Sequence, residues 1–214
     1  MKKAGYTLVN PGGYPVGAQD FSAQIAKFKA AKVEIVTGVF APPDFTTFWN
    51  QAAQQGFKPK VASIAKALLF PSAVQALGKA GANLSTEVWW SPDHPFTSSL
   101  IPGLTPKVYT AEYMAASKKQ WTQPIGFKFA LFEVAADVLK RTKKIDDKES
   151  IVEAVRATNV QTIIGPVRWS GQPVKNVCRT PLVGGQWRQG KQFPYDLVIV
   201  NNQHAPNIPV GGKL

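Results

Sequence analysis

Few residues of this chain carry the chemistry that catalysis or metal binding needs. The two histidines, His94 and His204, stand in Pro-containing loops, and the single cysteine, Cys178, has no histidine near it in the sequence. Metal sites and nucleophile–base pairs bring such groups together in clusters or at helical spacing. We therefore expect two exposed histidines, a small structural cysteine, no catalytic residue and no metal site.

Known enzyme motifs are also missing from the sequence. It has no Gly-x-Ser-x-Gly turn and no Gly-rich phosphate loop that ends in Lys-Ser or Lys-Thr. Pro11-Gly12-Gly13 follows a strand-like segment, but a proline beside two glycines is typical of a turn. The sequence predicts a protein that is not an enzyme and that needs no cofactor.

The first ninety residues alternate between apolar strand patterns and amphipathic helix patterns. Strands are predicted at 6–9, 34–40, 60–64 and 86–90, and helices at 21–31, 44–55 and 71–77. Asp20 and Asp44 stand where helix N-caps are expected. Strands that alternate with helices predict βαβ units and a parallel sheet.

The pattern changes after Trp90. An irregular loop rich in Ser, Pro and Gly leads to predicted helices at 107–120, 123–141 and 148–157. Two further strands are predicted at 181–187 and 195–200. The middle block is thus expected to be helical, with no strong strand of its own.

Composition and charge limit the classes of function that the chain can have. With 214 residues, 44% of them hydrophobic and 18% charged, the chain has the composition of a packed globular protein. Its apolar runs are too short to span a bilayer. The net charge of +12 does not come from one basic patch, since the only dense run, 140–144, ends a predicted helix. Nucleic acid is not an expected partner.

The N-terminal residues have no export signal. Two lysines precede a short apolar run, but that run stops at Val9 and meets Asn10-Pro11-Gly12-Gly13. A secretory signal needs a longer apolar region. We expect this chain to carry no signal peptide.

Several segments, taken in order, resemble a known family. It is the type I periplasmic solute-binding proteins of ABC transporters, typified by the branched-chain amino-acid (Leu/Ile/Val) binding proteins. The segments similar to the second lobe of this family are 20–25, 36–40, the helix after 42–44, and 54–60, while 163–169 and 184–187 resemble its closing part. No single segment is specific, but their collinear order covers almost the whole chain.

The resemblance implies an α/β fold of the periplasmic binding protein type I kind, in one nearly complete and one partial lobe. The nearly complete parallel-sheet lobe would comprise 1–95 and 166–202. A mostly helical piece of the other lobe would comprise 96–165, followed by a C-terminal tail at 203–214. The chain would then be truncated at its N-terminus relative to the family.

The resemblance also suggests ligand-binding residues. Ligands of open α/β sheets bind beyond the carboxyl ends of the strands, and Phe40 stands where the family has an aromatic residue that packs on the solute. Lys66 stands in the neighbourhood where amino-acid binders have an acidic residue for the ligand's ammonium group. This chain has a positive charge there instead, which favours an anionic solute. Trp90 and Phe127 could add aromatic walls. Core packing for the three aromatic residues, and a solvated surface position for Lys66, stay open as alternatives.

The function implied by the resemblance is that of the substrate-binding component of an ABC uptake system. It would bind a small amino acid or carboxylate-bearing solute in the cleft between two lobes, with a membrane ABC permease as partner of the full-length, periplasmic protein. Two alternatives use the same fold: a cytosolic ligand-sensing module, and an oligomeric module that self-associates through the incomplete lobe.

Overall fold

The computed structural model describes residues 2–214 and divides them into two compact units. Unit 1 comprises the residues up to Glu87 together with Gly185–Val198, and unit 2 comprises Val88–Gly184 and Ile199–Leu214. The lobes expected from the sequence are divisions of the family's fold, whereas these two units are the compact parts of this chain. Their bounds stay a prediction.

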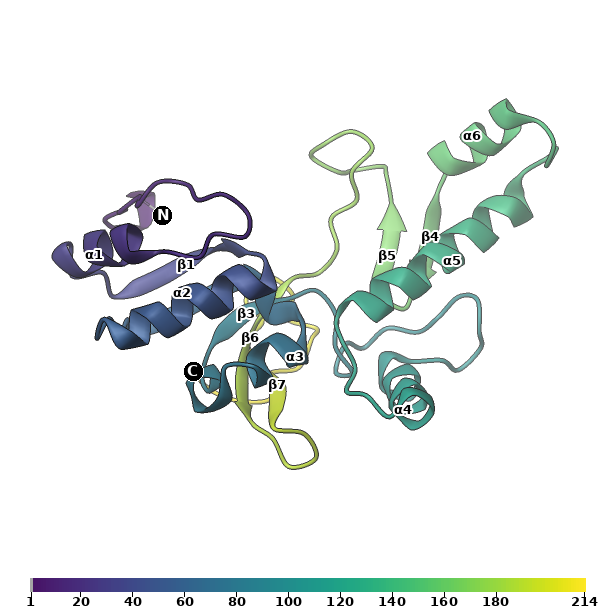
Figure 1. The fold of residues 1–214 in the computed structure, drawn as a ribbon. Coiled ribbons are helices and arrows are strands. Elements are labelled where there is room, and N and C mark those ends of the chain that lie inside the picture. The colour runs from purple at the N-terminus through teal and green to yellow at the C-terminus, as the bar shows by residue number, and fades with distance from the viewer. Residues whose placement is uncertain (1) are drawn as a thin grey trace. The chain divides into compact units, whose positions relative to one another are not determined.

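A five-stranded sheet runs through unit 1. Its strands, in spatial order, are β1 (Ile35–Phe40), β2 (Val61–Lys66), β3 (Ser85–Val88), β6 (Val183–Gln189) and β7 (Tyr195–Asn201). β1 pairs with β2 in parallel, and β2 with β3 likewise. The expected α/β class with a parallel sheet is confirmed. β1 stands at one end of the strand order, at the margin of unit 1 (Figure 1).

The strand predicted at 6–9 is wrong. Tyr6, Thr7, Leu8 and Val9 have no regular secondary structure, and neither described sheet includes them. Their alternating apolar pattern suits a strand, but a strand also needs a neighbour whose backbone pairs with it. This segment has none within the described residues.

Helices cover the sheet of unit 1 where the sequence predicts them. They are α1 (Ser22–Ala30), α2 (Pro42–Gln54) and α3 (Pro71–Gln75), with the 3-10 turns η1 (Lys2–Ala4), η2 (Ala67–Leu69) and η3 (Gly78–Gly81). Asp20 was expected to cap α1, but the N-cap residue is Phe21, and Asp20 lies one residue before it, where its Oδ1 accepts the Ser22 N–H at 2.9 Å. Asp44 was expected to cap α2, but it lies inside the first turn of that helix. Its Oδ1 accepts the Gly17 N–H at 3.1 Å instead.

An aromatic cluster fills the space between β1, α1 and α2. Phe21, Phe45 and Phe48 are almost fully buried, and Phe40 lies within 5.3–6.2 Å of all three, measured between ring centroids. Edge-on and tilted ring pairs at these separations are favourable beyond their buried area. This cluster anchors the carboxyl end of β1.

Unit 2 is built mainly from α4 (Pro106–Ser117), α5 (Pro124–Arg141) and α6 (Lys148–Arg156). The expectation that this block has no strand of its own is wrong. β4 (Asn159–Thr162) and β5 (Gly165–Arg168) form an antiparallel hairpin that turns at Ile163 and Ile164. Polar residues dominate β4, so its sequence has no apolar alternation that would predict a strand.

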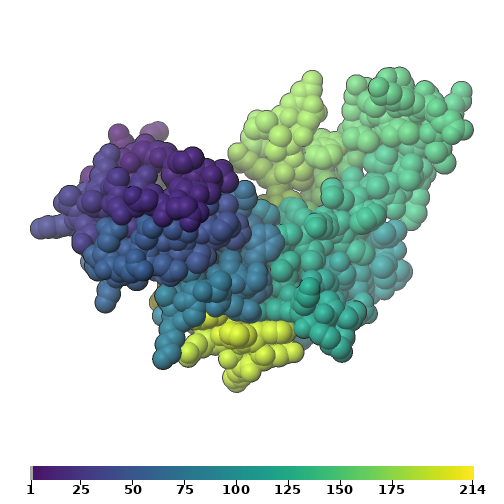
Figure 2. All heavy atoms as spheres, in the orientation of Figure 1, coloured from purple at the N-terminus to yellow at the C-terminus, as the bar shows by residue number. Residues whose placement is uncertain are grey.

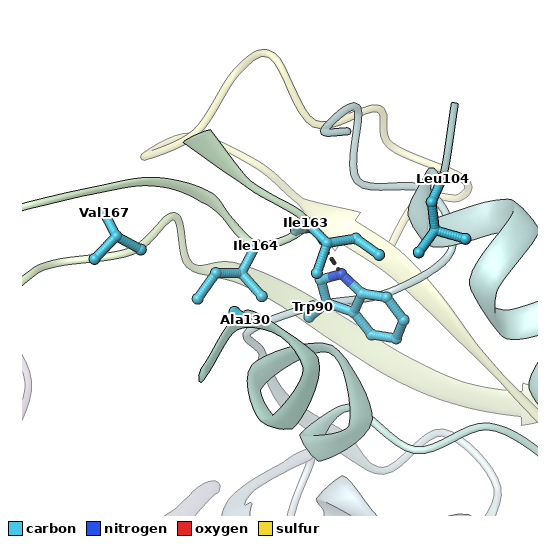
Figure 3. Close-up of a cluster of buried hydrophobic side chains, with 6 residues drawn as sticks. All are labelled: Trp90, Leu104, Ala130, Ile163, Ile164 and Val167. Carbon is cyan, nitrogen blue, oxygen red and sulfur yellow. Dashed lines mark hydrogen bonds between the residues drawn. The ribbon is translucent and has the colours of Figure 1, made fainter. Parts of the chain in front are cut away.

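The core of unit 2 surrounds one tryptophan. Trp90 is fully buried, and its Nε1–H donates to the Ile163 carbonyl at 3.0 Å (Figure 3). Around it lie the buried side chains of Leu104, Ala130, Ile163, Ile164 and Val167. The buried carboxylate of Glu133 on α5 accepts the Ser99 N–H at 2.9 Å and the Ile163 N–H at 2.8 Å. It thereby ties the loop and the hairpin to that helix.

Gly126 gives the first test of this core. A Cβ at Gly126 would lie 2.3 Å from Cδ2 of the Trp90 indole. Because the ring is fully buried, Gly126→Ala should destabilise the protein by about 1–3 kcal/mol through overpacking. Urea unfolding followed by tryptophan fluorescence measures the change. Gly13→Ala, whose new Cβ would meet no atom within 4 Å, is the control and should have little effect. Equal stability of the two variants would contradict the packing described.

Candidate functional site

Two of the sequence-predicted site residues lie side by side in the sheet. Phe40 ends β1 and Lys66 ends β2, and the parallel register pairs these two residues directly. The carboxyl ends of parallel strands are where ligands bind in open α/β sheets. This edge of unit 1 is therefore the candidate site.

Lys66 leaves its strand in a strained backbone conformation. Its φ of 64° and ψ of −61° lie in a region that residues other than glycine rarely adopt. The Lys66 N–H is 3.4 Å from Oε1 of Glu87 on β3, and the buried turn η2 begins at the next residue. Lys66 itself is exposed. The backbone thus turns sharply at the edge and leaves an ammonium group open to solvent.

Phe40 places an aromatic ring at the same edge. It is half-buried and stacks on Tyr14, with ring centroids 5.2 Å apart and planes inclined by 21°. The Tyr14 hydroxyl donates to the Val39 carbonyl at 3.2 Å, which fixes the pair against β1. Burial and the nearby Asp44 carboxylate raise the pKa of Tyr14 above its ordinary value, so this hydroxyl stays protonated at neutral pH.

A hollow of about 460 Å³ lies at the start of α2, two residues beyond Phe40. The first turn of α2 and the start of α3 line it, through Pro42, Pro43, Thr46, Phe70 and Ala73 among others. Most of its lining is apolar. Unit 1 therefore offers an apolar hollow, an aromatic ring and a cation close to the ends of β1 and β2.

The other two predicted site residues belong to unit 2. Trp90 is 0% exposed and packs in the core, which is the alternative that the sequence left open for it. Phe127 on α5 is half-buried and meets Trp89 edge-on, with ring centroids 5.8 Å apart. Both residues thus lie in unit 2, whereas Phe40 and Lys66 lie in unit 1.

Trp89 is a partly exposed aromatic residue that the sequence reasoning did not select. Along β3 and beyond, burial alternates, so Trp90 faces the core and Trp89 faces the other way. The Trp89 N–H donates to Oε1 of Gln123 at 2.7 Å. The alternation of side chains along a strand could have identified Trp89, because only one of two successive strand residues can face the core.

His94 overturns the expectation of two exposed histidines. Its side chain is buried, with 2% of its surface exposed, whereas His204 is exposed as predicted. The Nδ1 atom lies 2.9 Å from the Ser91 hydroxyl and 3.1 Å from the Ser91 N–H, and Nε2 has no hydrogen-bond partner. Burial lowers the pKa of His94 from 6.5 to about 4. The ring packs near Phe96, so it belongs to the interior of unit 2.

Groups suited to metal binding are dispersed in the structure. Within residues 2–214, histidine, cysteine and acidic side chains do not gather in any group of three or more that could hold an ion. Cys178 is half-buried, with its Sγ 3.8 Å from the Pro166 carbonyl oxygen. Among the described helices, none combines the length and apolar character required to cross a membrane.

Comparison with known proteins agrees with the fold. A family model described as "Periplasmic binding protein" matches residues 1–192. The chain belongs to the periplasmic binding protein family. The family resemblance drawn from the sequence is thereby confirmed.

Relatives of this periplasmic binding protein are longer than it is. The Leu/Ile/Val-binding protein homolog 7 of Brucella abortus (strain 2308) is 26% identical over 200 residues, which are 89% of this chain and 48% of that protein. The chain spans about half the length of the curated relatives it matches.

Solved structures show the same fold. The leucine-binding protein LivK of Thermotoga maritima superimposes with a TM-score of 0.70 at 20% identity, over 88% of this chain and 50% of that one. LivJ of Streptococcus pneumoniae, in complex with isoleucine, gives 0.60 at 13% identity over 88% and 50%. A solute-binding protein from R. palustris, in complex with benzoate, gives 0.61 at 15% identity over 92% and 51%.

The buried His94 predicts a pH-dependent stability. Its pKa is about 4 in the folded protein and 6.5 when unfolded, so the unfolded chain binds more protons between these values. The contribution of the neutral His94 to the free energy of unfolding is fully present above pH 6.5. It falls as the pH drops toward 4, by up to about 1.4 kcal/mol per pH unit. Urea unfolding of the wild type and His94→Asn across pH 4.5–7.5 measures it. The variant should be less stable at pH 7 and have a shallower slope. Parallel pH curves would contradict a neutral buried His94.

Proposed function

We propose that this periplasmic binding protein contributes to the capture of a small solute for an ABC uptake system, without performing catalysis. The observation that carries the proposal is the register pair of Phe40 and Lys66, which places an aromatic face and an exposed ammonium at one edge of a parallel sheet. Its membership in the family supports the transport role. A periplasmic location and a membrane ABC permease as partner belong to the same proposal.

The ligand we propose is a small carboxylate with an apolar body. Isoleucine and benzoate, bound in two of the structural neighbours, share this chemistry. The ammonium of Lys66 would pair with the carboxylate as a point charge, and the ring of Phe40 would pack against the apolar part. The hollow at the start of α2, whose lining begins two residues after Phe40, would give that apolar part room.

The charges at this edge favour an anion over a zwitterion. Lys66 is exposed, whereas the Glu87 carboxylate, which would suit an ammonium group, is half-buried and faces the Lys66 N–H. Burying the ammonium of an amino acid without a counter-charge would cost free energy. Benzoate should therefore bind more tightly than isoleucine.

The charge of Lys66 can be tested apart from its backbone. Lys66→Met keeps a long side chain in the same strained conformation but removes the cation. We expect it to weaken benzoate binding by at least about tenfold, which corresponds to one charge-assisted contact. Isothermal titration calorimetry of the 214-residue chain with benzoate and isoleucine measures this.

The matched control is Lys66→Gly, which also removes the cation but suits the positive φ. It should bind as poorly as Lys66→Met while unfolding at a higher temperature, because about 1 kcal/mol or more of backbone strain is relieved. Unchanged benzoate affinity in both variants would overturn the role of Lys66. Absence of heat with either solute for the wild type would count against the proposed ligand class.

A further inference from the structure

The fold gathers lysines that are dispersed in the sequence at the end of unit 1 where β1 and β2 begin. α1 and α2 both finish at this end, and each leads through a short turn into its strand (Figure 1). Two stretches, 27–34 and 55–60, supply five exposed lysines, which are Lys27, Lys29, Lys32, Lys58 and Lys60. Glu34 is the only acidic residue of these stretches, and neither stretch contains an arginine. We call this surface the lysine face.

Packing holds the two stretches of the lysine face together. The ring of Phe28 stacks on that of Phe57, with centroids 5.8 Å apart and planes inclined by 25°. The Lys29 ammonium donates to the Gln55 carbonyl at 2.5 Å, which joins the end of α1 to the end of α2. Figure 2 shows the purple-blue and blue atoms of these segments at one end of unit 1, with single side chains that project from the surface. The lysine face is therefore one continuous surface.

The turn after α1 has a lysine where glycine is favoured. After both α1 and α2, the residue with positive φ donates its N–H to the carbonyl three residues earlier, and the next residue donates to the carbonyl five residues earlier, at 2.8–3.0 Å. The positive φ is 68° at Gly56 after α2 and 52° at Lys32 after α1. This turn prefers glycine, because a side chain crowds the backbone there. Position 32 thus keeps a cation on the lysine face although its backbone favours glycine.

Most of the positive charge of the lysine face has no counter-charge within unit 1. Lys60 forms an ion pair with Glu34, and both side chains stay more than half exposed. Among residues 2–214, Lys27, Lys32 and Lys58 have no acidic partner. Five lysines and one glutamate give the surface a net charge of +4. Such a cluster attracts an anionic surface over a distance of about a screening length.

The composition of the lysine face favours an anionic lipid surface as its partner. Protein interfaces are enriched in aromatic residues and Arg and depleted in Lys. Nucleic-acid sites combine cations with Arg forks or with exposed rings on which bases stack. Here arginine is absent, and Phe57 is buried under Phe28. A bilayer with anionic headgroups requires only a cluster of about four to eight cations.

We propose that the lysine face binds the surface of a bilayer that contains anionic phospholipid. The ammonium groups would lie near the lipid phosphates as point charges, without insertion of side chains into the hydrocarbon. Phe40 and Lys66 lie at the opposite ends of the same two strands. A bilayer on the lysine face therefore leaves the proposed solute site uncovered, and the two surfaces can be occupied at the same time.

Cosedimentation of the 214-residue chain with sucrose-loaded vesicles tests the proposal. Vesicles of phosphatidylcholine with about 30% phosphatidylglycerol should bind the protein at about 0.05 M NaCl, and vesicles of phosphatidylcholine alone should not. About 0.5 M NaCl should release the protein, because it shortens the screening length to a few ångströms. Equal binding to the two kinds of vesicle, or no binding to either, would overturn the proposal.

Two matched double variants separate the lysine face from the net charge of the chain. Lys32→Gln with Lys58→Gln removes two cations of this face, and Lys118→Gln with Lys119→Gln removes two exposed cations of unit 2. Each pair includes one lysine with positive φ after a helix, 52° at Lys32 and 57° at Lys118. The first pair should weaken binding to the anionic vesicles at least about tenfold, since each cation contributes about fivefold. The second should have little effect, and equal weakening by both pairs would refute a role for the lysine face.

Glu34→Gln should act in the opposite direction. It removes the one negative charge of the lysine face and releases Lys60 from its ion pair, so vesicle binding should strengthen by up to about fivefold. Unchanged or weaker binding would contradict the proposal.

A fluorescein-labelled DNA duplex tests the other occupant by fluorescence anisotropy. Duplex binding that Lys32→Gln with Lys58→Gln weakens, without binding to vesicles, would assign the lysine face to nucleic acid and overturn the proposal. Neither assay contains benzoate or isoleucine, so this proposal and the proposed solute can fail separately.

Discussion

The parallel pairing of β1 with β2 is the constraint on which the rest of unit 1 depends. Its register brings Phe40 and Lys66 to one edge, and the same register decides which backbone groups of β1 face away from the sheet. A shift by one residue would exchange the buried Val36 for the exposed Thr37 and would carry Phe40 out of the aromatic cluster. The proposed solute site and the aromatic cluster beside β1 are therefore two consequences of one register.

Local pattern was sufficient for most of the fold. The strands of the sheet, the helices between them and the three helices of the middle block follow from apolar periodicity, and Phe40 and Lys66 follow from the ends of strands that the periodicity places. These residues could be found because their position depends on where an element ends. That they lie at one edge also follows once the sheet is parallel, whereas their direct pairing depends on the register of β1 on β2.

Other features depend on contacts between distant segments, which periodicity does not encode. His94 is buried because Phe96 and the interior of unit 2 close over its loop, and a loop motif alone reads as exposed. The β4–β5 hairpin has a polar first strand, and the Glu133 carboxylate that holds the Ile163 N–H comes from a helix thirty residues earlier. Choosing between Trp89 and Trp90 required knowing which alternate residues of β3 face the core, and not only that burial alternates there.

At Lys66 and at residues 6–9 the local rules and the fold disagree. Lys66 holds a positive φ that suits glycine, and Tyr6–Val9 has a strand pattern without a pairing partner. Such conflicts are expected at functional positions. Tyr14, which stacks on Phe40 and donates to the Val39 carbonyl, comes from the N-terminal segment that follows residues 6–9, so the position of the Phe40 ring in the proposed solute site depends on how that segment packs against β1.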